Sequence, residues 1–115
     1  MKILKFEDLI AWRKSQDVAV SIYSEFSELK DFSFKDQIRR AVVSISNNIA
    51  EGFERSSKAD FVRFLYIALA SCSEVKSMLY LAERLNYISE KKRIDLMKQA
   101  TEISKILTGL IKSLK

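Results

Sequence analysis

Acid–base or nucleophilic chemistry in this chain would depend on tyrosine, lysine and carboxylate side chains, because its 115 residues include no histidine and one cysteine. Without imidazole there is no catalytic triad, no histidine-ligated zinc and no side chain that titrates near neutral pH. The lone Cys72 excludes an internal disulfide and a four-cysteine metal site. Gly52 and Gly109, the only glycines, cannot build a glycine-rich phosphate loop. We therefore expect no enzyme activity, metal, cofactor or small-molecule substrate.

Positive charge gathers near the carboxyl end of the chain. Residues 87–115 hold seven basic and three acidic side chains and contribute +4 to a net charge of +5. Four lysines recur there every seven residues, and on a helix they would form one lysine stripe: Lys91, Lys98, Lys105 and Lys112. Such a stripe can follow a phosphate backbone. Arg63 and Arg84 would extend this nucleic-acid-binding surface.

The same stripe has a second interpretation, as an ordinary solvated helix face. Lys91 with Asp95, and Lys98 with Glu102, are pairs of opposite charge four residues apart, which would partly neutralise the stripe. Taken alone, the spacing favours the solvated face.

Another stripe, nearer the middle of the chain, combines charged and neutral polar side chains at spacings of three and four. Its members, called here the polar ladder, are Gln37, Arg40, Ser44, Asn48, Glu51 and Arg55. They would lie on one helix face, either exposed to solvent or hydrogen-bonded to a neighbouring helix or subunit. Periodicity alone does not choose between these interpretations.

Helices must position these stripes. Apolar residues at spacings of three, four and seven predict four helices, at about residues 6–29, 34–53, 58–85 and 90–114. The absence of proline and the scarcity of glycine argue against sandwiches and barrels. Short loops join antiparallel neighbours, so we predict one all-α domain over residues 1–115, an antiparallel up-down-up-down four-helix bundle.

The ends of the predicted helices have their own signals. We expect Ser33, Ser57 and Ser89 to cap the amino ends of the second, third and fourth helices. Gly52 stands where the second helix should end, and Asn86 is suited to the left-handed conformation that closes the third.

One segment of the third helix, residues 61–70, is apolar on nearly every side. A single bundle needs one buried stripe per helix, and a second subunit would cover the remaining apolar surface. We expect an oligomer interface at Phe61, Tyr66, Ile67 and Ala70. The alternative is that these side chains lie exposed at the bundle edge.

The apolar stretches of the chain are short. No segment reaches the roughly 20 apolar residues of a membrane span. The amino-terminal residues show no apolar signal core. These observations predict no membrane contact and a cytoplasmic location.

Four motifs along the chain form a combined pattern. They are Phe6-x-x-Leu9-x-x-Trp12, Gln37-x-x-Arg40-Ala41-x-x-Ser44-Ile45-x-x-Asn48-Ile49-Ala50-Glu51-Gly52, Phe61-x-x-Phe64-Leu65-x-x-Ala68-x-x-Ser71-x-x-Glu74 and Leu85-Asn86-Tyr87. With these motifs the chain resembles the four-helix-bundle proteins encoded in intervening sequences of bacterial 23S ribosomal RNA genes. The chain departs from the family pattern by lacking the proline before the second helix and by having Asn86 in place of glycine.

The resemblance implies a bundle that assembles as a ring, typically a homopentamer. It also implies similarity to the accessory protein of diversity-generating retroelements, which partners a reverse transcriptase and contacts nucleic acid. Two functions of different classes follow. The first is a non-enzymatic oligomer that binds RNA or a reverse-transcriptase complex through basic surfaces. The second is a protein-interaction scaffold ring without direct nucleic-acid contact.

Overall fold

The periodic apolar residues fold into four α-helices, which a computed structural model describes over residues 3–115. The helices are α1 (Ile10–Glu25), α2 (Phe32–Phe53), α3 (Lys58–Arg84) and α4 (Glu90–Leu114), with a short 3-10 helix, η1 (Phe6–Asp8), before them. No strand occurs in this part of the chain. The predicted all-α fold class is therefore confirmed.

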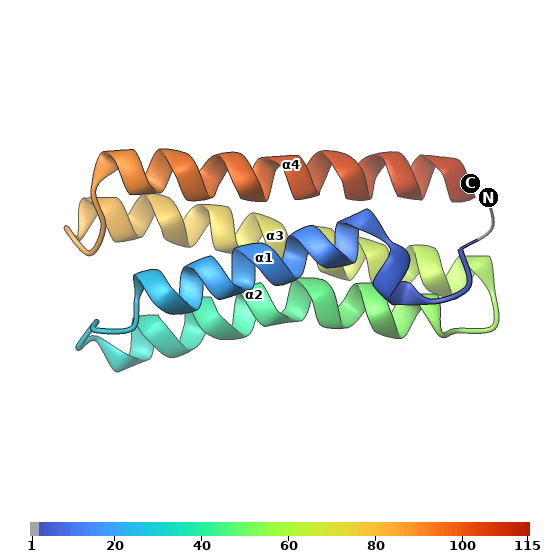
Figure 1. Ribbon diagram of the computed structural model, residues 1–115, viewed down its shortest axis with the longest axis horizontal. Coiled ribbons are helices and arrows are strands. Elements are labelled where there is room, and N and C mark those ends of the chain that lie inside the picture. Colours follow the sequence, from blue (N-terminus) through green and yellow to red (C-terminus); the bar gives the residue numbers. More distant parts are fainter. Residues whose placement is uncertain (1–2) are drawn as a thin grey trace.

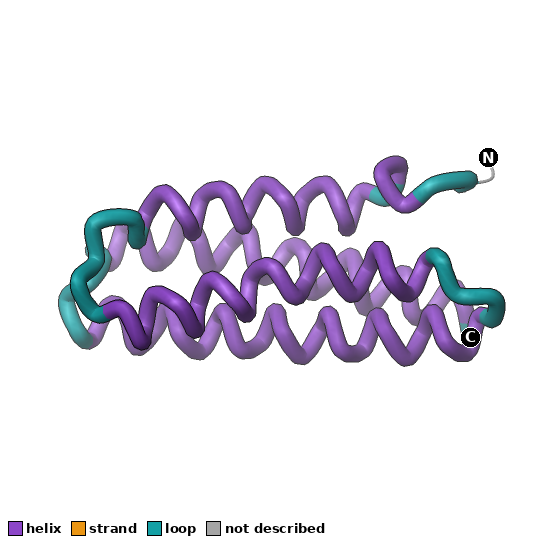
Figure 2. The backbone as a smooth tube through the Cα atoms, turned by 90° about the horizontal axis from the view of Figure 1, so that it is seen from below, coloured by secondary structure: helices purple, strands orange, loops and turns teal. Residues whose placement is uncertain are grey.

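The helices lie side by side along a body of 43 × 22 × 19 Å. The chain runs in alternate directions through successive helices, and its carboxyl end lies at the same end of the bundle as η1 (Figure 1). α2 packs against α1 and α3, and α4 packs against α3 and α1. The pairs α1/α3 and α2/α4 therefore occupy opposite corners, with short loops at both ends (Figure 2).

The core lies between the four helices, and each helix contributes one buried stripe. Fully buried members include Val18, Ile22, Ile38, Ile45, Ile49, Leu65, Leu79, Ile103 and Leu107. Burying a side chain of this size contributes about 1.5–3 kcal/mol each. The opposite side of each helix faces solvent.

The first predicted helix is shorter than the sequence pattern indicates. Instead of one helix over residues 6–29, the chain forms η1, passes through Leu9 in an extended conformation with ψ of 125°, and then forms α1. Phe6 still reaches Trp12, with the two ring centroids 5.3 Å apart. After Glu25 the chain turns, although Leu29 still packs on the core.

The second helix begins at a different cap from the one predicted. The side chain of Asp31, not that of Ser33, accepts a hydrogen bond from the Phe34 amide at 3.1 Å. The other carboxylate oxygen of Asp31 accepts a hydrogen bond from the Tyr87 hydroxyl at 2.6 Å. Both hydrogen bonds favour the charged carboxylate and lower the pKa of Asp31, with Tyr87 as the main cause.

The other helix ends divide into confirmed and corrected predictions. Ser57 and Ser89 each accept a hydrogen bond from the amide three residues on, at 3.1 Å, and Asn86 has a φ of 62°. Gly52, in contrast, lies inside α2 and does not end it. A Cβ atom on Gly52 would lie 2.6 Å from the Cβ of Phe64, so this glycine permits the close approach of α2 and α3.

The expectation about membrane-spanning length needs correction for α3. This helix is long and apolar enough to cross a membrane by length and composition, with a mean hydropathy of 1.2 over its most apolar window. A helix in the core of a bundle meets the same criterion. The side of α3 that carries Leu65, Cys72 and Leu79 is fully buried against its neighbours.

Candidate nucleic-acid interface

The lysine stripe forms the outer ridge of α4. All four of its lysines are exposed, on the side of the helix opposite the buried Leu96, Ile103 and Leu107. Among residues 3–115, none of the four forms an ion pair within 4 Å. The stripe therefore presents positive charge that the chain does not neutralise by direct contact.

The predicted pairing of Lys98 with Glu102 is wrong, and so is that of Lys91 with Asp95. Glu102 turns to Lys14 of α1, with 2.5 Å between the carboxylate oxygen and Nζ. Asp95 accepts a hydrogen bond from a side-chain amide of its own helix instead. The hydrogen bond from Lys14 is the main cause of the lowered pKa of Glu102, and Lys98 adds a smaller electrostatic effect.

α3 presents an exposed row beside this stripe. Its residues recur at spacings of three and four, include no carboxylate, and form what we call the outer row of α3: Arg63, Tyr66, Ala70, Ser73, Ser77, Tyr80 and Arg84. The two arginines stand at its ends. Arg63 lies 3.5 Å from Asp60, whereas Arg84 has no carboxylate within 4 Å among residues 3–115.

Contacts between α3 and α4 fix how the two rows align. The Cys72 thiol donates to the Ala100 carbonyl at 3.1 Å and accepts from the Ser104 hydroxyl at 3.2 Å. Nearer the loop, Arg93 Nε donates to Glu83 Oε1 at 2.7 Å. The lysine stripe, the outer row and the surface between them make up the α3/α4 face, and all six predicted nucleic-acid-binding residues lie on it.

Two tyrosines on this face, Tyr66 and Tyr80, were not among the predicted nucleic-acid-binding residues; Tyr66 was predicted for the oligomer interface, and Tyr80 was not predicted for any site. The guanidinium of Arg93 lies 5.1 Å from the centre of the Tyr80 ring, and Nζ of Lys115 lies 5.4 Å from that of Tyr66. Lys115 also donates to the Tyr66 hydroxyl at 3.1 Å. Tyr66 and Tyr80 are fourteen residues apart, which is two heptads. This spacing, already visible in the sequence, places both rings on one side of α3.

A hollow of about 470 Å³ opens on the exposed side of α4. Lys98 and Lys105 border it, and Ile94 and Met97 supply its apolar surface. Glu102 also lines this hollow, so the two lysines stand beside one negative charge there.

The inner members of the polar ladder connect α2 to α3. Ser44 accepts a hydrogen bond from Ser71 at 2.9 Å, and the Asn48 amide donates to the hydroxyl and carbonyl of Ser44 at 2.9 and 2.8 Å. Further along, Gln37 donates to the carboxylate of Glu74. The sequence allowed either a solvent-exposed ladder or one hydrogen-bonded to a neighbouring helix, and these bonds correspond to the second.

The outer members of the ladder are exposed. Arg40 donates to Gln37 at 3.3 Å, and Arg55 lies with its guanidinium 4.7 Å from the centre of the Phe64 ring. Glu51 forms no ion pair with any residue from 3 to 115. The ladder is therefore part interhelical contact and part solvated face.

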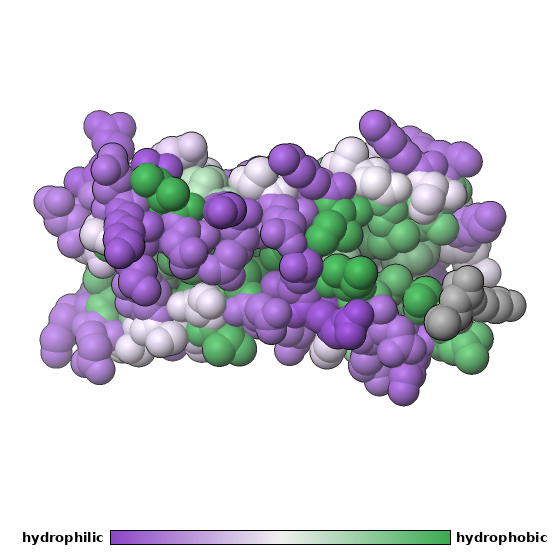
Figure 3. Space-filling view, turned by 45° about the horizontal axis from the view of Figure 1, so that its top comes forward, coloured by the Kyte–Doolittle hydropathy of each residue, from purple (hydrophilic) through white to green (hydrophobic). Residues whose placement is uncertain are grey.

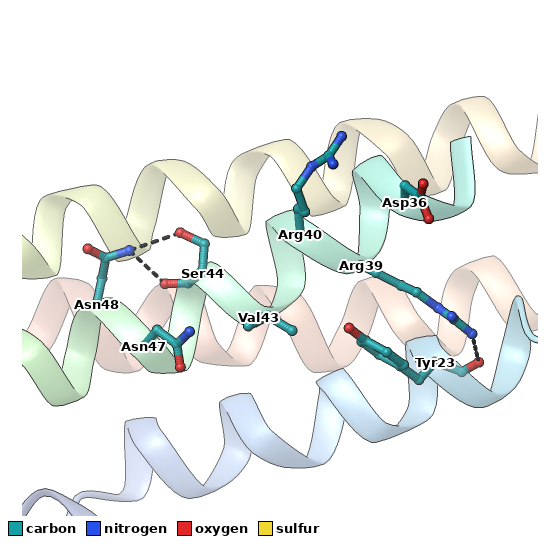
Figure 4. Close-up of a pocket in the computed structure, with 8 residues that line it drawn as sticks. All are labelled: Tyr23, Asp36, Arg39, Arg40, Val43, Ser44, Asn47 and Asn48. Carbon is teal, nitrogen blue, oxygen red and sulfur yellow. Dashed lines mark hydrogen bonds between the residues drawn. The ribbon is translucent and has the colours of Figure 1, made fainter. Parts of the chain in front are cut away.

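A second hollow, of about 590 Å³, lies on α2 and reaches Tyr23 of α1. Figure 4 shows Arg39 lying along Tyr23, while Arg40 projects from another side of α2. The Arg39 guanidinium is 4.4 Å from the Tyr23 ring centre and donates to the Tyr23 carbonyl at 3.2 Å. Arg39 thus holds α1 against α2.

The four residues predicted for an oligomer interface differ in their surroundings. Phe61 packs edge to face on Phe53, with 5.8 Å between ring centroids, and is half-buried. Tyr66 and Ala70 belong to the outer row, and Ile67 lies toward α2 with 39% of its surface exposed. The hydrophilic surface also has apolar patches elsewhere, notably near the end that carries the termini (Figure 3).

These features define a small helical-bundle protein with charged and apolar outer faces. Within residues 3–115 no three histidine, cysteine, aspartate or glutamate side chains gather as a metal site requires. The model of the 23S rRNA-intervening sequence protein family matches residues 7–109, and the chain belongs to this family.

A solved structure supports the same assignment. The chain is similar to a protein of unknown function from the S23 ribosomal protein family of Bacteroides thetaiotaomicron, with 36% identity and a TM-score of 0.84. The match covers 90% of this chain and 99% of the other. No curated protein sequence matches the chain.

Proposed function

We propose that the protein is a non-enzymatic, oligomeric helical bundle that binds RNA through the α3/α4 face. The observation that carries this proposal is the lysine stripe, whose four exposed lysines have no ion-pair partner among residues 3–115. The stripe favoured a solvated face only because Glu102 and Asp95 were expected to neutralise it. Because Glu102 pairs with Lys14 instead, that objection weakens.

The spacing of the stripe suits a phosphate backbone. Successive lysines rise about 10.5 Å along the helix, at 1.5 Å per residue. Lysine is a compact point charge that contacts phosphate without reading bases. Binding through the stripe is therefore tolerant of sequence and falls steeply as salt rises, because each contact releases a counterion.

Oligomerisation belongs to the same proposal. Ile67 and Leu81 lie on the α2 side of α3, and are 39% and 47% exposed. Beside them runs the polar ladder, which a second copy could complete. A homopentamer of this +5 chain would carry a net charge of about +25, which raises the local attraction for nucleic acid.

The same exposed apolar side chains support the second candidate, a scaffold ring that organises a protein partner, such as a reverse transcriptase. In that case the lysine stripe would only keep the protein soluble. The two candidates differ in one measurable property, the salt-dependent binding of RNA.

The test is the triple change of Lys98, Lys105 and Lys112 to Glu, measured by fluorescence anisotropy with labelled RNA between 50 and 200 mM salt. RNA affinity should be lost while the helical circular dichroism signal persists. The matched control is the change of Lys5, Arg13 and Lys30 to Glu, three exposed basic residues outside α3 and α4 with the same change in charge. Equal RNA affinity in both variants would reject the interface and favour the scaffold.

A further inference from the structure

The two exposed tyrosines on the outer row of α3 give the α3/α4 face a feature beyond charge. Tyr66 is 47% exposed and Tyr80 is 54% exposed, so about half of each residue's surface is open. They are fourteen residues apart on one side of the helix, which separates them by about 21 Å. The residues between them on the row are small: Ala70, Ser73 and Ser77.

We propose that Tyr66 and Tyr80 stack on the bases of unpaired RNA, so that the α3/α4 face selects single-stranded over duplex RNA. This inference rests on the proposed RNA-binding function and names the form of RNA that the face accepts. Exposed tyrosine rings stack on any base, because every base offers a flat π surface.

The register between α3 and α4 places each ring beside positive charge. Since Cys72 lies level with Ala100 and Ser104, Tyr80 lies level with the first two lysines of the stripe and Tyr66 with the last two. Arg93 and Lys115 approach the two rings directly. Each ring therefore has two lysines of the stripe at its level, so that a strand whose bases stack on the rings can place its phosphates near the stripe.

Arg93 is held in place more firmly than a lone surface arginine. Its Nε donates to Glu83 at 2.7 Å while its guanidinium lies near the Tyr80 ring. Glu83 thereby holds the Arg93 guanidinium beside the Tyr80 ring. The Arg93 side chain is already ordered before RNA binds. Preorganised contacts of this kind cost less entropy when a ligand binds.

A duplex would not use these rings. Its bases are stacked inside the helix, and the deep major groove of double-stranded RNA is too narrow for side chains to read. A single strand exposes its bases, and the distance between the two tyrosines spans about six stacked nucleotides at 3.4 Å each. The small residues between the rings leave room for a strand to lie along α3.

The experiment compares a labelled 12-nucleotide oligo(U) with a 12-base-pair RNA duplex, using the full chain and fluorescence anisotropy. Changing Tyr66 and Tyr80 together to Leu should weaken oligo(U) binding about 25-fold or more, since each lost stacking contact is worth about fivefold at least and the two factors multiply. Duplex binding should change less than twofold. The double change to Phe should restore oligo(U) binding, because it keeps both rings.

Tyr23→Leu is the matched control, because Tyr23 is also exposed and also lies against a cationic side chain, but on α1. It should leave oligo(U) affinity unchanged. The Tyr-to-Leu variants should also keep the wild-type slope of log affinity against log salt, since a lost stacking contact releases no counterion.

The possible failures are distinct. If the lysine reversal abolishes binding but the Tyr-to-Leu variant binds oligo(U) like wild type, the stacking inference is overturned and RNA binding stands. If the lysine reversal has no effect, the proposed function itself fails. If Tyr66→Leu changes the oligomer mass in light scattering, Tyr66 belongs to a subunit contact and the inference is also overturned.

Discussion

Two glycines in helix interiors provide a direct test of how closely α2 and α3 pack. We predict that Gly52→Ala destabilises the protein and that Gly109→Ala stabilises it. Both glycines lie within α-helices and neither has a positive φ, so alanine gains helix propensity at both: about 0.8–1 kcal/mol at Gly109, and at most that at Gly52, the next-to-last residue of α2. The surroundings of the two positions decide the sign.

At Gly52 the added methyl group has no room. Its Cβ would lie 2.6 Å from the Cβ of Phe64, 3.0 Å from Cδ1 of Phe61 and 3.3 Å from the Phe61 carbonyl oxygen. The first and third of these atoms are fixed to the backbone of α3, so relief requires the two helices to separate. Overpacking of this kind costs about 1–3 kcal/mol, and values near the upper end outweigh the propensity gain by about 2 kcal/mol.

At Gly109 nothing lies within 4 Å of an added Cβ, and the full propensity gain of about 0.8–1 kcal/mol remains. The two variants should thus differ by at least the overpacking cost, about 1–3 kcal/mol, in the free energy of unfolding. Urea unfolding followed by circular dichroism measures this, at one protein concentration because oligomerisation adds to stability. A Gly52→Ala protein as stable as Gly109→Ala would refute the packing argument.

Three further changes test other contacts. The pKa of Asp31 is lowered on folding, so the ionised carboxylate stabilises the folded protein above its usual pKa of about 3.9. This stabilisation is lost as pH falls through the folded pKa. Tyr87→Phe should therefore reduce the loss of thermal stability in acid. Arg40→Ala or Glu51→Ala should cost under about 1 kcal/mol in a free subunit, because both are exposed, and a larger loss in melting experiments would mark a buried subunit contact. Ile67→Glu should lower the mass measured by light scattering if α3 joins subunits.

Much of the fold follows from periodicity, and the errors fall where two signals compete. The spacing of three from Phe6 to Trp12 suits a 3-10 turn as well as an α-helix, so it could not reveal the break at Leu9. Asp31 and Ser33 are both good caps two residues apart. Tyr87, more than fifty residues later, favours Asp31 by binding its second oxygen. No local pattern contains that contact.

The site was predictable only one helix at a time. A seven-residue period places the lysines on one side of α4, and the direction of Arg63 and Arg84 depends on how α3 packs. Tyr66 and Tyr80 were overlooked as partners of the stripe for the same reason, because they belong to a different helix. The contacts of Cys72 fix the register between α3 and α4. In this register Tyr66, Tyr80, Arg63 and Arg84 all border the α3/α4 face.

The partner of Glu102 shows how packing changes the electrostatics of the stripe, and it yields a last prediction. In an isolated helix Glu102 would pair with Lys98, but α1 brings Lys14 to it. Glu102 still carries a negative charge beside the stripe, worth about 0.5 kcal/mol against a phosphate 8 Å away in water. Glu102→Gln should therefore tighten RNA binding about twofold at 50 mM salt.

Lys14→Met should have the opposite effect. It removes the partner that draws Glu102 away, so the carboxylate can turn to Lys98 and neutralise it. The double variant should bind RNA about as well as wild type, because it lacks both charges. Lys14→Met removes a positive charge and Glu102→Gln removes a negative one. If Lys14→Met nevertheless binds RNA more tightly than Glu102→Gln, the charge of the lysine stripe does not set the affinity.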